Sequence, residues 1–296
     1  MKKSLRRLLR WSTAVVPPLV LFGIGMQIRR MRLALPEKTS LAPICRTLDF
    51  LCCSLAPKCV LRRVPCGTGF CMFWIRVNDP SHYDLARGFY EPTMIAWLNE
   101  NTKLGDTFLD IGANVGYYAV LAAKLVGPTG LVIAVEADPN IAEILRKNLE
   151  ANHLSNARVI SGAATDFAGT VRVGRAPASG WTGLYYATPE EWIDVPAFTV
   201  DGLSRSLGLN QVNVVKVDVE GAEASVLDGM TDVLKRFTPR LLIEVHRTHS
   251  GVEEHVLKIL AAHSFETEIL DSVDATMHVA ATPTLKSAIG ERESAQ

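Results

Sequence analysis

One stretch of the chain combines acidic, amide and small residues at a spacing suited to ligand binding. It reads FLDIGANVG over residues 108–116, where an apolar run enters a loop with glycines four residues apart. Gly112 permits a tight turn against which a ligand can lie closely. Unpaired amides at the start of the following helix can bind an anionic group. The stretch therefore predicts a ligand-binding loop at the carboxyl end of a strand, with the Asp110 carboxylate beside it.

A second acidic residue, Glu136, ends the next apolar run. A carboxylate at this position can accept hydrogen bonds from ribose hydroxyls. Asn114 stands where the second glycine of G-x-G-x-x-G would fall, which argues against a nicotinamide dinucleotide, and the sequence lacks the G-x-x-x-x-G-K-[ST] pattern of a P-loop. Asp110 also disfavours a diphosphate, but it suits a ligand that carries an ammonium and a sulfonium. These residues together predict S-adenosylmethionine as the cofactor.

Charged residues alternate in a further stretch, KVDVEGAE at residues 216–223. Alternation along a strand places Lys216, Asp218 and Glu220 on one side. Buried charges are costly unless they are paired or functional, so we predict that Lys216, Asp218 and Glu220 are catalytic residues. Asp218 would orient cofactor or substrate, and Glu220 would bind acceptor hydroxyls. A salt bridge from Lys216 to a neighbouring acid is the structural alternative. His246 ends a later apolar run and is a candidate general base, because its reference pKa lies near working pH; a structural histidine is the alternative.

These residues need a scaffold, and short β-rich runs alternate with helical patterns from about residue 76 onward. The expected strands are 107–111, 131–136, 158–160, 212–219, 240–245, 265–270 and 276–280, with a hairpin around 171–173, and the expected helices are 116–125, 141–149 and 222–236. Alternation of this kind predicts an α/β fold with a mostly parallel, doubly wound sheet. The last two strands are too close for a helix between them, so one antiparallel strand is expected near the C-terminus.

Charge is distributed unevenly, although 31 basic and 31 acidic residues balance to a formal net charge of zero. Residues 1–78 hold 14 basic and 2 acidic residues (+12), which leaves 17 basic and 29 acidic residues (−12) in the rest of the chain. Two parts with different surroundings are therefore expected. The acidic part would repel phosphates, so nucleic acid is not the expected partner.

The N-terminal part opens with a basic stretch, followed by an uncharged run over residues 11–28 that arginines close. This length is at the lower limit for crossing a hydrocarbon core of about 30 Å, and Pro17 and Pro18 disfavour an ideal spanning helix. Three interpretations stay open: a cleaved signal peptide, a membrane anchor or interfacial helix that binds a membrane surface through residues 1–32, and an apolar helix packed on the main domain. Arginines where a cleavage site should lie disfavour the first.

All six cysteines lie between residues 45 and 71. No pair has the C-x2-C spacing of zinc ribbons and no histidine lies among them, so no metal site is predicted. Disulfides would need an oxidising compartment, and the spacing does not support palmitoylation. Cys45, Leu48 and Cys52 share a helical face, which makes packing the expected role.

Three strings, DIGANVGYYAVLAA, VIAVEADP and VVKVDVEGAE, resemble the FkbM family of S-adenosylmethionine-dependent methyltransferases, and GFYEP and LIEVH fit the same pattern. The resemblance implies a class I Rossmann-like methyltransferase fold, here preceded by an N-terminal apolar helical segment. The expected organisation is a basic and apolar segment at 1–35, a Cys-rich connecting region at 36–72, a methyltransferase domain at 73–285 and a tail at 286–296. The implied reaction is in-line methyl transfer to a hydroxyl of a sugar, lipid or small metabolite.

The resemblance also implies which residues bind the cofactor: Glu91, Asp110, Gly112, Asn114, Gly116, Glu136 and Asp166. Glu136 would bind the ribose, Asp166 the adenine amino group and Glu91 the ammonium, whereas the remaining four line the methionine end. A plain turn residue is the alternative for Asp166, and a helix cap for Glu91.

The cofactor is an intracellular metabolite, so the catalytic part is expected in the cytoplasm or at the cytoplasmic side of a membrane. Two other functions stay open: a nicotinamide-dependent oxidoreductase, and a membrane-tethered binding protein that keeps the fold without catalysis.

Overall fold

The computed structural model describes residues 59–67, 69–76, 85, 90–175, 182–183, 191–247, 251–273 and 275–284. The strands are β1 (Cys59–Cys66), β2 (Gly69–Arg76), β3 (Thr107–Ile111), β4 (Leu131–Glu136), β5 (Ala157–Ser161), β6 (Ala163–Ala164), β7 (Gly169–Arg175), β8 (Thr182–Gly183), β9 (Glu191–Phe198), β10 (Val214–Val217), β11 (Arg240–His246), β12 (Phe265–Val273) and β13 (Thr276–Pro283). The helices are α5 (Pro92–Asn101), α6 (Tyr117–Val126), α7 (Pro139–Ala151), α8 (Val200–Ser206), α9 (Glu223–Asp228), α10 (Thr231–Phe237) and α11 (Val252–Ala262).

The expected N-terminal apolar segment lies outside the described residues, as do Cys45, Cys52 and Cys53. Within the described part of the chain, no helix combines the length and the apolar character needed to cross a membrane.

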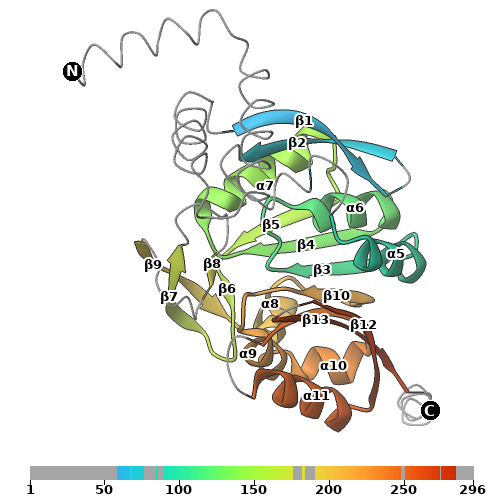
Figure 1. Ribbon diagram of the computed structural model, residues 1–296, viewed down its shortest axis with the longest axis vertical. Coiled ribbons are helices and arrows are strands. Elements are labelled where there is room, and N and C mark those ends of the chain that lie inside the picture. The colour runs from blue at the N-terminus through green and yellow to red at the C-terminus, as the bar shows by residue number, and fades with distance from the viewer. Residues whose placement is uncertain are drawn as a thin grey trace, which may run out of the picture.

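A seven-stranded sheet in the order β12-β13-β11-β10-β3-β4-β5 forms the centre of the molecule (Figure 1). Strands β11, β10, β3, β4 and β5 pair in parallel, whereas β13 is antiparallel to both β11 and β12. This confirms the predicted α/β fold with one antiparallel strand near the C-terminus. The strand order reverses between β3 and β10, and open α/β sheets bind ligands at the carboxyl ends of strands at such a point.

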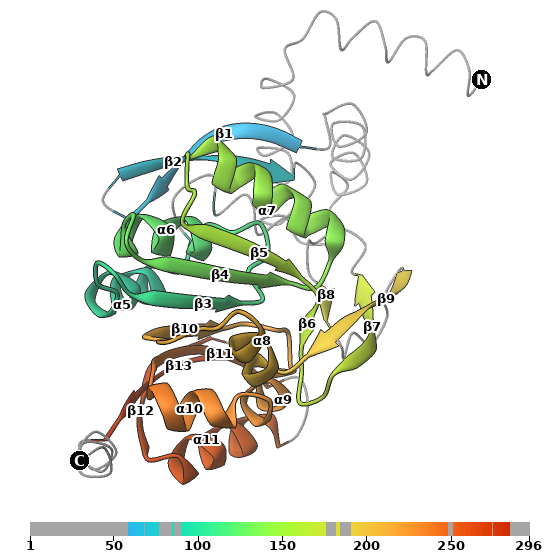
Figure 2. The same cartoon turned by 180° about the vertical axis from the view of Figure 1, so that it is seen from behind.

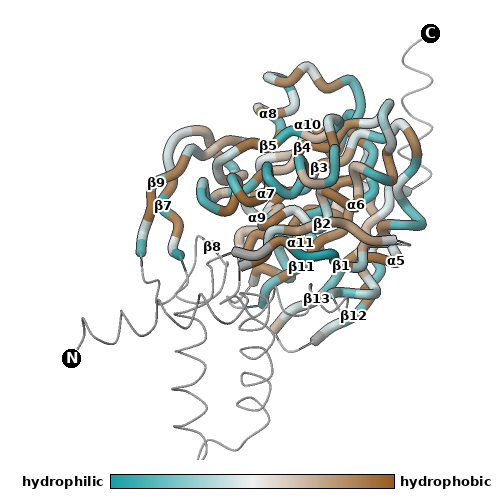
Figure 3. The backbone as a smooth tube through the Cα atoms, turned by 90° about the horizontal axis from the view of Figure 1, so that it is seen from above, coloured by the Kyte–Doolittle hydropathy of each residue, from teal (hydrophilic) through white to brown (hydrophobic). Residues whose placement is uncertain are grey.

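Helices cover both faces of the sheet (Figures 1 and 2). On one face, α5, α6 and α7 share a core with Phe108, Val214 and Leu242. On the other face, α8 to α11 share a core with Leu109 and Val215. Side chains alternate between faces along a strand, so even-numbered residues of β3, β10 and β11 lie on the α5–α7 face. Helix α7 mixes hydrophobic and hydrophilic residues along its length (Figure 3), as expected for a helix with one buried side.

The β1–β2 hairpin packs against α7 through two asparagine side chains. Asn148, which is fully buried, accepts from the Trp74 amide at 2.6 Å and donates to the carbonyl oxygens of Trp74 (3.3 Å) and Val115 (2.7 Å). Asn152 accepts from the Met72 amide at 2.9 Å and donates to its carbonyl at 2.7 Å. The hairpin therefore shares the core of the sheet although it begins before the expected limit at residue 73. The domain limits stay a prediction.

Two of the hairpin cysteines fit the packing role expected for the cysteines. Cys66 and Cys71 are free thiols, both are buried, and both belong to the core on the α5–α7 face.

Replacing Asn148 should loosen the contact between the hairpin and α7. We expect Asn148→Ala to lower the free energy of unfolding by about 2–4 kcal/mol, because buried backbone groups lose their partners at a cost of about 1–3 kcal/mol each. Amide hydrogen exchange should then accelerate at Trp74 more than at residues of β3. Lys147→Ala, on the exposed side of the same helix, is the matched control and should change neither quantity. Unchanged exchange at Trp74 in the Asn148 variant would contradict the coupling.

The helix expected at 222–236 is two helices, α9 and α10, separated by Gly229 and Met230. A Cβ on Gly229 would lie 2.1 Å from the backbone oxygen of Thr165, so the chain breaks the helix where it passes this loop. The carboxylate of Asp201 accepts hydrogen bonds from the first amides of α10. The contact is long-range, and helical periodicity alone does not reveal it. The expected hairpin around 171–173 is confirmed, since β7 pairs with β9 in antiparallel orientation.

Candidate active site

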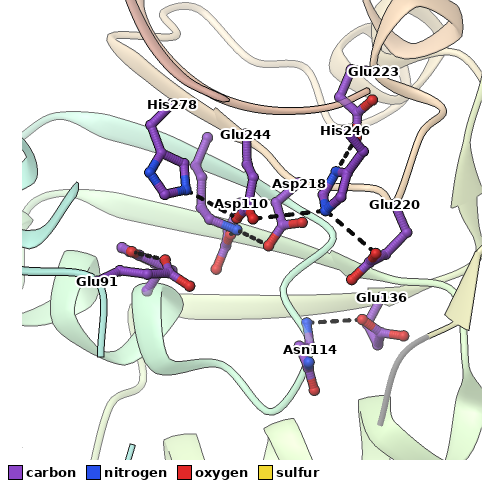
Figure 4. Close-up of polar contacts among 12 residues, drawn as sticks. Glu91, Asp110, Asn114, Glu136, Asp218, Glu220, Glu223, Glu244, His246 and His278 are labelled. Atoms are coloured by element: carbon purple, nitrogen blue, oxygen red, sulfur yellow. Dashed lines mark hydrogen bonds and ion pairs between the residues drawn. The ribbon is translucent and has the colours of Figure 1, made fainter. Parts of the chain in front are cut away.

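A row of charged side chains crosses the α5–α7 face of the sheet at the carboxyl ends of its strands (Figure 4). The pairing of β10 with β3 sets Lys216 beside Asp110. The pairing of β11 with β13 sets Glu244 beside His278, and His246 follows two residues further along β11. Two residues earlier on these strands, the same face carries apolar side chains that belong to the core. Charged side chains therefore replace apolar ones only at this edge of the sheet.

The loop after β3 is held close to the end of β10. Gly112 has φ of 81°, and a Cβ there would lie 1.7 Å from the backbone oxygen of Asp218. Gly116 has φ of 88° and precedes α6, and a Cβ there would meet the side chain of Leu145 at 2.0 Å. We predicted that the glycines serve the approach of a ligand. The structure shows that both also serve contacts within the protein, with a backbone carbonyl and with α7.

Glu136 ties this loop to β4. Its two carboxylate oxygens accept from the amides of Asn114 and Asp138, each at 2.8 Å. Burial raises the pKa of Glu136 to about 7, although both hydrogen bonds act in the opposite direction. Each oxygen keeps a lone pair that a ribose hydroxyl could use, so the geometry is compatible with the predicted role and adds a structural one.

Asp110 is fully buried, and neither of its oxygens accepts a well-formed hydrogen bond from the residues that the structure describes. The nearest cation is the Lys216 ammonium, 4.0 Å from Oδ1. Burial raises the pKa of Asp110 to about 6, against the opposing effects of Lys216 and the Ala119 amide. Buried carboxylates without partners are uncommon. This one suits a ligand with a cationic group, as S-adenosylmethionine has.

A small pocket lies between the loop after β3 and the end of β10. It is lined by Leu85, Tyr90, Gly112, Ala113, Asn114, Val115, Tyr117, Tyr118, Lys216 and Asp218. Four residues that we predicted to bind the cofactor or to take part in catalysis therefore line one cavity: Gly112, Asn114, Lys216 and Asp218.

Glu91 reaches the same region from the segment before α5. Its backbone is left-handed (φ 37°), and its carboxylate accepts a hydrogen bond from the Tyr118 hydroxyl. Glu91 occupies the N-cap position of α5, as the helix-cap alternative expected, but its side chain makes no capping hydrogen bond. Burial raises the pKa of Glu91 to about 7. The Lys216 ammonium lies over the Tyr118 ring, 4.7 Å from its centroid.

Lys216 is 1% exposed, and its ammonium lies 3.0 Å from Oδ2 of Asp218. Burial lowers the pKa of Lys216, but the charges of Asp218 and Asp110 outweigh burial and hold the pKa above its ordinary value. Lys216 is therefore a buried cation between two carboxylates. Of the two interpretations of this residue, the geometry is that of the salt bridge.

His246 is surrounded by carboxylates. Its Nδ1 lies 2.9 Å from Oε1 of Glu223, and its Nε2 lies 3.3 Å from Glu220 and 3.7 Å from Glu244. Burial lowers the pKa of His246, but the hydrogen bond to Glu223 and the charges of Asp218 and Glu220 raise it to about 10. The imidazole thus carries a proton at neutral pH in these surroundings. Its role as a base, inferred from the reference pKa, stays a prediction.

Glu220 follows β10 in a left-handed conformation (φ 55°) and keeps a quarter of its side chain exposed. Burial and the charge of Asp218 raise its pKa to about 8. Asp166 accepts a hydrogen bond from the Ser225 hydroxyl at 2.7 Å and is exposed in the loop after β6. Its role toward adenine stays a prediction.

Three residues of the site were not predicted from the sequence: Glu223, Glu244 and His278. Glu223 is fully buried and also accepts from the Gly221 amide at 2.9 Å. Glu244 could have been found, because it alternates with His246 on one side of β11 as Lys216 does with Asp218. His278 could not, since only the antiparallel register of β13 brings it to Glu244, with 3.6 Å between Nε2 and Oε2.

Residues 110–267, more than half of the chain, match the family model described as the methyltransferase FkbM domain. A hexuronic acid methyltransferase of Haloferax volcanii, AglP, is 28% identical over 180 residues, which are 60% of this chain and 71% of that protein. Protein-L-isoaspartate O-methyltransferase 1 of Archaeoglobus fulgidus is 42% identical over 88 residues, 29% of this chain and 41% of that enzyme. The chain thus matches less than half of the second relative's length.

Solved structures that are similar to this chain include Aeropyrum pernix fibrillarin with natively bound S-adenosyl-L-methionine. It is 20% identical with a TM-score of 0.42, and the match covers 62% of this chain and 68% of fibrillarin. M. jannaschii TYW2 in complex with AdoMet is 15% identical with a TM-score of 0.42, covering 76% and 84% of the two chains.

Proposed function

Since the chain belongs to the FkbM methyltransferase family, we propose that it transfers a methyl group from S-adenosylmethionine to a hydroxyl of a sugar, lipid or small metabolite. The observation that carries the proposal is the Asp110 carboxylate, fully buried without a hydrogen-bond partner among the described residues at the point where the strand order reverses. A carboxylate there needs a cationic ligand more than an anionic one. The hexuronic acid methyltransferase of Haloferax volcanii supports a sugar as the acceptor class.

The cofactor side of the site is formed by Asp110, Glu91 and Glu136. Asp110 and Glu91 would hold the cationic methionine end, and Glu136 the ribose. When bound, S-adenosylmethionine supplies an electrophilic methyl group on its sulfonium. Lys216 offsets the charges of Asp110 and Asp218, so that the two carboxylates can stay close together at the strand ends.

The acceptor side lies at the ends of β10 and β11. Asp218, Glu220 and Glu244 offer carboxylate oxygens to hydroxyl groups, and sugars present several hydroxyls to such a set. Glu220 is the most exposed of these groups, and in its ionised form it would take the proton of the attacking hydroxyl. The Nε2 of His246, 3.3 Å from the Glu220 carboxylate, would keep that carboxylate in place. The rate then comes mainly from holding the hydroxyl in line with the methyl group.

A binding and turnover experiment on the full-length protein tests the function. Calorimetric titration should show saturable binding of S-adenosylmethionine and none of NADH, which separates this function from the oxidoreductase alternative. Mass spectrometry should then detect S-adenosylhomocysteine when hexoses and uronic acids are offered. We expect Glu220→Gln to reduce turnover about 100-fold or more with unchanged cofactor affinity, because general base catalysis is worth about 10²–10⁴-fold.

Glu150→Gln, on the exposed side of α7, is the matched control and should change neither binding nor turnover. Folded wild-type protein that does not bind S-adenosylmethionine would overturn the proposed function. Full turnover in the Glu220 variant would overturn only the role given to Glu220.

A further inference from the structure

Three potential metal ligands meet at the ends of two neighbouring strands. Asp218 follows β10, and Glu244 and His246 alternate on one side of β11, so that a carboxylate oxygen from each acid and a nitrogen from the histidine lie within 4.8 Å of one another. Ligand atoms around one ion lie about 2.0–2.2 Å from it and therefore roughly 3–4 Å from one another. Small side-chain rotations would bring these three to a common ion. Two adjacent parallel strands hold them in place (Figure 4).

The imidazole of His246 has the outer partner that a metal-binding histidine usually has. Its Nδ1 lies 2.9 Å from Oε1 of Glu223, and an ionised carboxylate can only accept, so Nδ1 carries the hydrogen. Glu223 is itself fully buried and held by the Gly221 amide. Metal-ligating histidines almost always donate through their second nitrogen to such a group. The bond leaves Nε2 facing two carboxylates, 3.3 Å from Oε2 of Glu220 and 3.7 Å from Oε1 of Glu244.

Glu244 is held from its other side by a second histidine. The Nε2 of His278 is buried, lies 3.6 Å from Oε2 of Glu244, and has no hydrogen-bond partner among the described residues. The Nδ1 of His278 is bound to Asp271 on β12, which fixes the ring. Buried polar atoms without a hydrogen-bond partner are uncommon in folded proteins.

Negative charge is in excess around these ligands. Four carboxylates, those of Asp218, Glu220, Glu223 and Glu244, surround His246. Two cations face them, the His246 imidazole and Lys216, and Lys216 is shared with a fifth carboxylate, Asp110. Buried charges that are not offset are strongly destabilising. A divalent cation among the carboxylates would offset two of these charges.

From this geometry we infer that the protein binds one divalent metal ion through Asp218, Glu244 and His246. His246 would bind the ion through Nε2 as a neutral imidazole. The ion would bind the acceptor hydroxyl and lower its pKa, and Glu220, whose Oε2 lies 3.3 Å from the same Nε2, would accept the proton. This role of the ion rests on the proposed function, whereas the binding of the ion does not.

Binding of Mn²⁺ to full-length, EDTA-treated protein without cofactor or acceptor tests the site directly. Electron paramagnetic resonance should show loss of the free Mn²⁺ signal until one ion is bound per chain. Glu244→Gln and His246→Gln should each raise the dissociation constant at least about tenfold, because even the loss of an outer partner of a metal ligand costs about 10–100-fold in metal affinity. Glu150→Gln and His255→Ala, both at exposed positions, are the controls and should bind Mn²⁺ as wild type does.

Folded wild-type protein without saturable Mn²⁺ binding would overturn the inference, and so would wild-type affinity in both ligand variants. Circular dichroism on each variant shows that the protein is folded. Turnover that proceeds fully in EDTA would overturn the role of the ion and leave the proposed function standing. Site-specific Mn²⁺ binding without turnover of any acceptor, and without S-adenosylmethionine binding, would overturn the proposed function and leave the metal site standing.

Discussion

Asp110→Asn is expected to bind S-adenosylmethionine about 10- to 100-fold more weakly than wild type, while the folded protein becomes no less stable at pH 8. Hydrogen bonds to charged groups are worth about 1.5–3 kcal/mol. This buried carboxylate lies 4.0 Å from the Lys216 ammonium and accepts no well-formed hydrogen bond from the described residues, and it would meet the cationic end of the cofactor. Calorimetric titration measures the first effect and urea unfolding the second. Asp194→Asn, on the exposed strand β9, is the matched control and should leave cofactor affinity unchanged.

The stability that Asp110→Asn gains over wild type should increase as the pH rises. Burial raises the pKa of Asp110 from its ordinary value of 3.8 to about 6 in the folded protein. The ionised carboxylate therefore destabilises the folded state above pH 6, by about 1–3 kcal/mol for a shift of this size. Wild type recovers this stability as the pH falls from 6 to about 4, because the folded state takes up a proton there. The variant should exceed wild type most at pH 8 and match it at pH 4. Loss of stability at pH 8 would contradict the cost assigned to the buried charge.

Lys216→Met is expected to be the most destabilising single change in the site. The ammonium is 1% exposed and lies 3.0 Å from Asp218 and 4.0 Å from Asp110. Removal of one partner of a buried ion pair costs about 3–5 kcal/mol, because the opposite charge stays buried without compensation. Urea unfolding at pH 8 measures the loss. Lys235→Met, at an exposed position of α10, is the control and should change the free energy of unfolding by less than about 0.5 kcal/mol.

A double-mutant cycle separates the charge effect from a packing effect. Asp110→Asn in the Lys216→Met background removes one of the two stranded carboxylates, so the double variant should be more stable than Lys216→Met alone by more than Asp110→Asn gains in wild type. Simple addition of the two effects would show that Asp110 and Lys216 are not coupled. In that case the loss in Lys216→Met would belong to its contact with Asp218 and Tyr118 alone.

Local sequence patterns predicted much of the fold and most of the charged residues of the site. The apolar runs at 107–111, 131–136 and 240–245 became β3, β4 and β11 with ends that differ by at most one residue. A buried strand needs a continuous apolar run and its end is marked by turn residues, so such elements are written locally. The strand ends then placed Asp110, Glu136 and His246 at one edge of the sheet, because parallel strands share their carboxyl edge.

Other features depended on residues that are distant in sequence. Gly229 divides an expected helix because of Thr165, and Gly112 is required by the backbone of Asp218. The register of β13 brings His278 to Glu244, and no local pattern encodes which residues of two strands lie opposite each other.

The sequence by itself determined the seven strands of the central sheet, the ligand-binding loop after β3 and most of the charged residues at the strand ends. Only the tertiary structure decided what those residues do to one another. It made Lys216 a buried partner of two acids, moved the pKa of His246 to about 10, and joined Asp218, Glu244 and His246 into one cluster. The physical reason is that the charge and the geometry of a buried group depend on its neighbours in space, and in a sheet of this kind those neighbours come from other strands.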